Sequence, residues 1–145
     1  TVASTATVTG LNAGDTLVGI DFRPATGQLY GVGVTGDTVQ VYLIDPITAA
    51  ATPVGAAATV TTLAGATKFG VDFNPVPDRI RVVTDLPSDG AGGNANNFRL
   101  NPNTGALVAV DADLDFAAVP GGPPEVVVAY TNNVAGATTT TLFGI

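Results

Sequence analysis

Short runs of alternating apolar and polar residues, rich in Val, Thr, Ile, Tyr and Phe, fill this chain between clusters of Gly, Pro, Asn and Asp. Alternation with a period of two is typical of half-buried β-strands, and the intervening clusters are typical of turns. No stretch combines helical periodicity with capping residues. The pattern therefore predicts an all-β protein. Strands are expected at residues 5–9, 16–21, 28–34, 38–44, 51–54, 69–73, 79–84, 97–100, 106–110, 126–130 and 139–143.

One segment of this pattern is repeated. Residues 17–24 and 68–75 share the order Gly, apolar residue, Asp, Phe, one further residue and Pro, and residues 127–133 form a weaker third copy. A period of roughly 50 residues is typical of propellers, solenoids and other repeat architectures. The residues that define the repeat are Asp21, Phe22 and Pro24 in the first copy and Asp72, Phe73 and Pro75 in the second.

The repeat divides a single all-β domain, residues 1–145, into units of about 11–60, 61–115 and 120–145, preceded by a strand at 2–10. Each full unit reads as three or four strands in an antiparallel meander, which is the pattern of a propeller blade. The third unit has only an opening hairpin, and the strand at 2–10 has no partner in the first unit. We expect the third unit to be completed by that strand or by a neighbouring chain, and the latter contact would be head-to-tail.

The repeated motifs resemble those of a bacterial family, the domain of unknown function 4394 family, whose members are mostly secreted. The matching stretches are 19–31, 69–83, 99–106 and 129–133, and the resemblance extends over about residues 11–145. It implies a propeller-like repeat fold and export from the cell. The resemblance supplies no activity for the chain.

Charge and composition narrow the classes of function. Only 12% of the residues are charged and the net charge is −7, so the chain lacks the basic face that nucleic acids or anionic membranes require. No apolar run is long enough to cross a bilayer. The absence of Cys excludes disulfides and thiolate chemistry, and the absence of His removes the commonest general base. These features favour a secreted or cell-surface protein.

Three alternating aspartates, Asp111, Asp113 and Asp115, have a spacing that can place carboxylate oxygens around calcium. An EF-hand would need Gly at the sixth position and Glu at the twelfth, where this chain has Phe116 and Gly122. A calcium loop of another type stays open beside a polar strand end. Calcium is the one cofactor that the sequence suggests.

The segment 85–97 is long and Gly-rich where the first unit has only a short turn. Long loops on rigid scaffolds often carry binding sites, and amide and carboxylate oxygens suit sugar hydroxyls or a cation. A solvated loop without a ligand is the alternative. The candidate ligand-binding residues are Asp89, Asn94, Asn96 and Asn97.

The remaining charges lie in or beside apolar strands, where an unpaired charge is costly. We therefore expect Arg–carboxylate pairs, and we expect the repeated aspartates to bond turn amides. A catalytic pair of Asp21 and Asp72, acting as general acid and base, is the alternative, although nothing in the spacing brings them together. The charges in question are Asp21, Arg23, Asp72, Asp78, Arg79, Arg81 and Arg99.

Taken together, the sequence predicts a secreted, non-enzymatic structural or adhesive protein that self-associates through its incomplete last unit, into a closed ring or a filament. Its expected partner is a second copy of itself. The alternative is an extracellular module that binds carbohydrate or another small polar ligand, with polysaccharide as the partner. Neither nucleic acid nor membrane insertion is expected.

Overall fold

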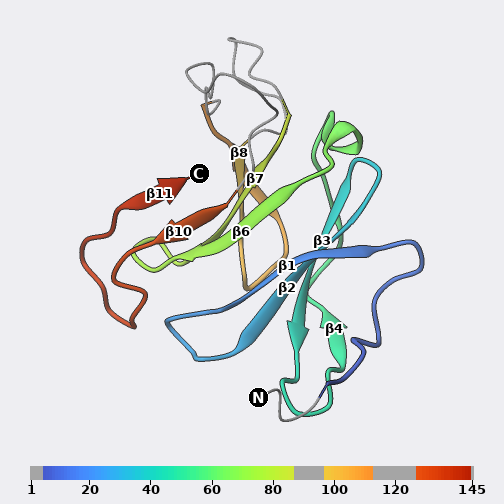
Figure 1. Ribbon diagram of the computed structural model, residues 1–145, viewed down its shortest axis with the longest axis horizontal. Coiled ribbons are helices and arrows are strands. Elements are labelled where there is room, and N and C mark those ends of the chain that lie inside the picture. The colour runs from blue at the N-terminus through green and yellow to red at the C-terminus, as the bar shows by residue number, and fades with distance from the viewer. Residues whose placement is uncertain (1–4, 87–96, 113–126, 145) are drawn as a thin grey trace.

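A computed structural model describes residues 5–86, 97–112 and 127–144 (Figure 1). The first unit is an antiparallel meander in which each strand pairs with the next in the chain. A fifth, short strand pairs with the beginning of the third strand, along the same edge as the fourth strand. The strands are β1 (Thr16–Phe22), β2 (Leu29–Thr35), β3 (Thr38–Ile44), β4 (Ala51–Pro53) and β5 (Ala58–Thr59).

The second unit repeats this meander, and the third contributes an antiparallel hairpin. The second sheet consists of β6 (Phe69–Asn74), β7 (Arg79–Thr84), β8 (Asn97–Leu100) and β9 (Leu107–Val110), and the hairpin of β10 (Val128–Tyr130) and β11 (Leu142–Gly144). The helical structure within the described ranges is one 3-10 turn, η1 (Leu63–Gly65), and none of it has the length or apolar character of a membrane span. The predicted all-β fold of antiparallel meanders is confirmed, whereas a propeller arrangement of the units stays a prediction.

The first strands of the three units lie beside one another, with β6 between β1 and β10 (Figure 1). The close approach of β1 to β6 depends on Gly19, because a Cβ atom at this position would lie 2.5 Å from a methyl carbon of Val71. The units therefore follow one another as a row of sheets, in the order of the sequence.

The main hydrophobic core lies between the first and second sheets. Alternating side chains of both sheets point into it, as the period-two pattern predicts. The rings of Tyr30 and Phe73 meet edge to face there, with centroids 5.5 Å apart and planes at 72°. The buried members of this core are Tyr30, Val32, Val39, Val41, Val60, Leu63, Phe73, Ile80, Val82, Phe98 and Leu100.

The described part of the N-terminal segment lies on the first sheet, not on the third unit. Thr9 forms a parallel bridge with Ala50, just before β4, and the amide of Ala51 donates to the Thr9 carbonyl at 2.8 Å. Val8 and Leu11 cover the sheet face that holds Tyr42. The expectation that the strand at 2–10 completes the third unit is therefore wrong for residues 5–10, because Thr9 bonds to the first sheet and Val8 is partly buried against it.

The third unit packs on the second in the same direction as the second packs on the first. Val128 and Leu142 of the hairpin cover Val83 on the far face of the second sheet. Because side chains alternate along a strand, Ala129 and its cross-strand partner Phe143 point away from the second unit. The row thus has an outer face at each end.

Candidate functional site

The repeated aspartates join consecutive units. Asp21 accepts a hydrogen bond from the amide of Phe73 in the next unit at 2.8 Å, through Oδ2. Asp72, at the same position of the second repeat, accepts one from the amide of Tyr130 in the third unit at 2.6 Å. We call these contacts the first seam (Asp21–Phe73) and the second seam (Asp72–Tyr130). The predicted bonds to turn amides are replaced here by bonds to strand amides of the following unit.

Asp21 also accepts a hydrogen bond from its neighbour's amide. The amide of Phe22 donates to Oδ1 of Asp21 at 2.7 Å. Both carboxylate oxygens of Asp21 are therefore acceptors from backbone amides.

The two seam carboxyls touch each other. Asp72 lies within hydrogen-bonding contact of Asp21. Burial raises the pKa of Asp72 from its ordinary 3.8 to about 7, and the Asp21 carboxylate raises it as well, against the opposing amide of Tyr130. A proton on Asp72 lets this side chain donate a hydrogen bond to Asp21 and removes the repulsion between two adjacent carboxylates. The spacing in sequence gave no sign of this contact, because it depends on β1 and β6 lying side by side.

The pair has the contact of a shared-proton dyad but not the open geometry of a hydrolase. Two carboxylates that act on a glycosidic bond are separated by about 5 Å or more, so that substrate and water fit between them. Here Asp21 uses both oxygens on the amides of Phe22 and Phe73, and Asp72 uses one on Tyr130. The arrangement holds strands together.

A buried arginine reinforces the first seam. Arg23 follows β1, and its guanidinium binds both carboxylate oxygens of Asp78 in the β6–β7 turn, with Nε at 2.9 Å from Oδ1. Nη1 donates to the side-chain oxygen of Asn103 at 2.8 Å and to the Tyr30 hydroxyl at 3.3 Å. Arg23 is 7% exposed. This paired arginine fixes two turns of the second unit to the end of β1.

A second charged cluster lies beside the second seam. Asp111 accepts from Nη1 of Arg81 and from Nη2 of Arg99, each at 2.6 Å. Burial alone would raise the pKa of Asp111, but the hydrogen bond from Arg99 and the charges of both arginines hold it below its usual range. Nε of Arg81 also donates to the Tyr130 hydroxyl at 3.1 Å. The cluster therefore links the second sheet to the third unit.

Two of the residues predicted to bind a ligand or calcium, Asn97 and Asp111, are described, and both form hydrogen bonds within the protein. Asn97 is buried, accepts from Arg81 at 2.6 Å and donates to the carbonyl of Ala112 at 2.8 Å. Asp111 is engaged by two arginines, and the part of the chain that the structure describes has no group of three metal-ligating side chains. The other candidates, Asp89, Asn94, Asn96, Asp113 and Asp115, lie outside the described residues.

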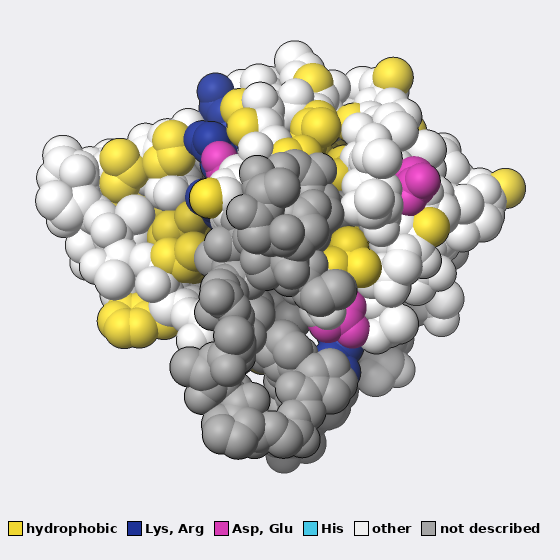
Figure 2. Space-filling view, turned by 90° about the horizontal axis from the view of Figure 1, so that it is seen from above, with side chains coloured by type: hydrophobic (Ala, Val, Ile, Leu, Met, Phe, Trp, Pro, Cys, Tyr) yellow, Lys and Arg dark blue, Asp and Glu magenta, His cyan; other side chains and the backbone are white. Residues whose placement is uncertain are grey.

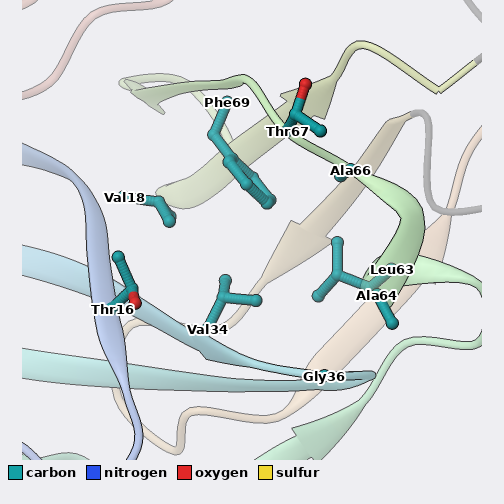
Figure 3. A pocket seen from close by; sticks show the side chains of 9 residues that line it. All are labelled: Thr16, Val18, Val34, Gly36, Leu63, Ala64, Ala66, Thr67 and Phe69. Atoms are coloured by element: carbon teal, nitrogen blue, oxygen red, sulfur yellow. The ribbon is translucent and has the colours of Figure 1, made fainter.

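A cavity of about 430 Å³ opens between the first two units (Figure 3). Its lining comes from β1, β2, η1 and the start of β6, so the sequence pattern of either unit alone gives no signal for it. The polar side chains in the lining are the hydroxyls of Thr16 and Thr67, and no lining residue is charged. The lining residues are Thr16, Val18, Val34, Gly36, Leu63, Ala64, Ala66, Thr67 and Phe69.

Two small apolar faces remain at the ends of the row. The head face consists of Ile20 and Phe22 on the outer side of β1, which are 54% and 52% exposed. The tail face consists of Val127, Ala129 and Phe143 on the outer side of the β10–β11 hairpin, and Phe143 is 60% exposed. Seen from above, charged side chains are sparse on the visible described surface, and hydrophobic side chains form scattered groups (Figure 2).

The comparisons with known proteins identify the family. The family described as Domain of unknown function (DUF4394) matches residues 1–145, and the chain belongs to this family. No curated protein and no solved structure matches the chain. The resemblance drawn from the repeated motifs is therefore confirmed.

Proposed function

We propose that this member of the DUF4394 family is a secreted, non-enzymatic structural protein that assembles through contacts between the head face of one copy and the tail face of another. One observation carries the proposal. Phe22 is 52% exposed, whereas Phe73, its equivalent in the next repeat, is 1% exposed against the preceding unit. The repeat position that is buried between units at Phe73 is therefore exposed at Phe22, at the head of the row.

The internal seams support this proposal. Val71 and Phe73 on β6 pack toward the first unit, and the same positions on β1 are Ile20 and Phe22. Inside the molecule, therefore, the face of the second unit that corresponds to the head face already packs against the unit before it. A second copy that continues the row reuses a contact that the fold makes internally. Such head-to-tail contacts close into a ring if the rotation permits, or otherwise build a filament of propeller-like units.

The composition of the surface supports assembly outside the cell. With 12% charged residues, few charges must be desolvated when copies pack together. Export is inferred from the resemblance to secreted family members and from the absence of Cys and His. The carbohydrate-binding alternative stays a prediction, and most of its candidate residues lie outside the described ranges.

The bonding of the paired aspartates supports a non-enzymatic role. A catalytic dyad presents free oxygens to water or substrate. Asp21 and Asp72 instead spend their oxygens on three backbone amides and on each other.

Sedimentation velocity over a wide range of protein and salt concentrations tests the proposed assembly, with electron microscopy of the largest species. We expect the mean mass to rise with protein concentration. It should also rise with salt, because a net charge of −7 on each copy opposes association until it is screened. A monodisperse monomer under all these conditions would rule the proposal out.

A further inference from the structure

Each seam has an inserting side chain and a receiving side chain at fixed repeat positions. The receiving residue lies directly across the sheet from the repeat aspartate. Tyr30 is paired with Asp21 and meets Phe73, with ring centroids 5.5 Å apart. Arg81 is paired with Asp72 and meets Tyr130, with its Nε 3.1 Å from the hydroxyl. At both internal seams, therefore, the residue paired with the repeat aspartate is the one that contacts the aromatic side chain of the next unit.

Among the described residues, the third unit has a receiving residue without an inserting partner. Phe143 is paired with Ala129, the residue at the repeat-aspartate position, and thus occupies the place of Tyr30 and Arg81. It is 60% exposed. Correspondingly, Phe22 has the inserting position of Phe73 and Tyr130 and is 52% exposed. The row presents one unmatched aromatic residue at each end.

The hydrogen bonds of the backbone agree with this pairing. The amides of Phe73 and Tyr130 each need a carboxylate from the preceding unit. The amide of Phe22 instead donates to its own neighbour, Asp21, at 2.7 Å. A head face therefore requires no carboxylate from the unit that covers it, and the tail face, which has Ala129 at that position, offers none.

The charges and the shape of the two faces are also compatible. Residues 127–144 contain no Asp, Glu, Lys or Arg, so another copy can approach this unit without a like-charge contact. Beside Ile20 the head borders a hollow of about 260 Å³ that is lined by Leu17, Leu29 and Ile44 among others. Asp45 also lines this hollow, and its other lining residues are apolar. An aromatic side chain that enters a mostly apolar hollow is a common anchor of protein interfaces.

We infer that Phe22 of one copy packs against Phe143 of the next, as a cross-chain version of the Tyr30–Phe73 contact. This inference rests on the proposed self-association and specifies its geometry. The contact is heterologous, since it joins two different faces. Each copy therefore has one head and one tail, and blocking either face on one copy leaves the other face competent.

Mixing two blocked variants tests this geometry. In Phe22→Asp the head is blocked, and in Phe143→Asp the tail is blocked, so neither variant should associate alone. An equimolar mixture should form a heterodimer, from the tail of the first variant and the head of the second, and should form nothing larger. Formation of that dimer also shows that both variants are folded. Val108→Asp, at an exposed position of β9 that is 43% exposed, is the matched control and should assemble like the unchanged protein.

The possible failures are distinguishable by sedimentation velocity. If the unchanged protein is monomeric, the proposed assembly itself is wrong. If the unchanged protein assembles but either blocked variant still associates alone, assembly stands and the Phe22–Phe143 contact is overturned. The contact is also overturned if the mixture stays monomeric although circular dichroism shows both variants to be folded.

Discussion

Among single residues, Asp21 and Asp72 have unequal roles in spite of their equivalent places in the repeat. Asp21 accepts from two backbone amides, whereas Asp72 accepts from one and contacts Asp21. Two adjacent carboxylates cannot both ionise without repulsion. The pKa of Asp72, which burial and the adjacent Asp21 raise to about 7, assigns the proton to Asp72.

This assignment predicts a fall in stability as the pH rises. The pKa of Asp72 is raised by folding to about 7, so its contribution is fully present below its unfolded value of 3.8 and is lost as the pH rises through about 7. The lowered pKa values of Asp85 and Asp111 act in the opposite sense, below their ordinary 3.8. Urea unfolding should show less stability at pH 8 than at pH 5. Equal stability at the two pH values would contradict the assignment.

Two amide substitutions separate the roles of the aspartates. In Asp72→Asn the side-chain oxygen still accepts from Tyr130 and the new NH₂ donates to Asp21, so stability should no longer fall between pH 5 and pH 8. In Asp21→Asn one of the two acceptor oxygens becomes a donor that faces a backbone amide, which should cost about 1–3 kcal/mol in the free energy of unfolding. Urea titration of both variants measures this difference, and the reverse order of stability would refute it.

Among the elements, the strands were predictable and their partners were less so. Alternation located β3, β7 and β8 at the residues expected, since each buries one side of a pleated strand. β5 and η1 were missed because they are short and lie in Ala- and Thr-rich sequence without a clear period. The N-terminal segment was assigned to the wrong sheet, because its pattern shows that it has an apolar side but not which sheet covers that side.

The linkage between units by Arg23 predicts a large effect of its removal. Arg23→Ala leaves Asp78 without its partner, and it leaves Tyr30 and Asn103 without a donor. The free energy of unfolding should fall by about 3 kcal/mol, a value at the lower end of the range for breaking a buried ion pair, because Asp78 is partly exposed. Arg23→Lys should recover only part of this loss, because an ammonium cannot bind both oxygens of Asp78 in the same way. Chemical denaturation measures both.

Arg79→Ala is the matched control for Arg23. Arg79 donates to the carbonyls of Pro77 and Asp78, and it adjoins the same turn. Its removal should cost less than about 1 kcal/mol. Similar losses for the two arginine variants would contradict the role given to Arg23 at the first seam.

The contact between β1 and β6 predicts that Gly19 tolerates no side chain. In Gly19→Ala the new Cβ would lie 2.5 Å and 2.6 Å from the Cγ2 and Cβ atoms of Val71, and a rotation of Val71 cannot relieve the second contact. Overpacking of this kind costs about 1–3 kcal/mol. Gly144→Ala, where the atom nearest to the new Cβ would be 3.9 Å away, should be nearly neutral. Thermal denaturation of both variants measures this difference. A neutral Gly19→Ala would show that the seam is loosely packed.

For the whole molecule, the repeat predicted the order of the units but not how they meet. Asp21 and Asp72 were identified from sequence as repeat positions, yet their contact arises only when neighbouring units stack. The same holds for the cavity beside Phe69 and for the two end faces, which depend on which side of each strand points outward. A repeat reveals that units recur, whereas the packing of one unit on the next determines what is left uncovered.

The head-to-tail contact between Phe22 and Phe143 is tested most directly by disulfide cross-linking, which is clean here because the chain contains no Cys. The double variant Phe22→Cys, Phe143→Cys should yield a ladder of dimers, trimers and larger species under mild oxidation. Phe22→Cys alone and Phe143→Cys alone should yield little cross-linked product, since equal residues do not meet in a heterologous contact. Cross-linking of a single variant as efficient as that of the double variant, or no ladder from the double variant, would contradict the account.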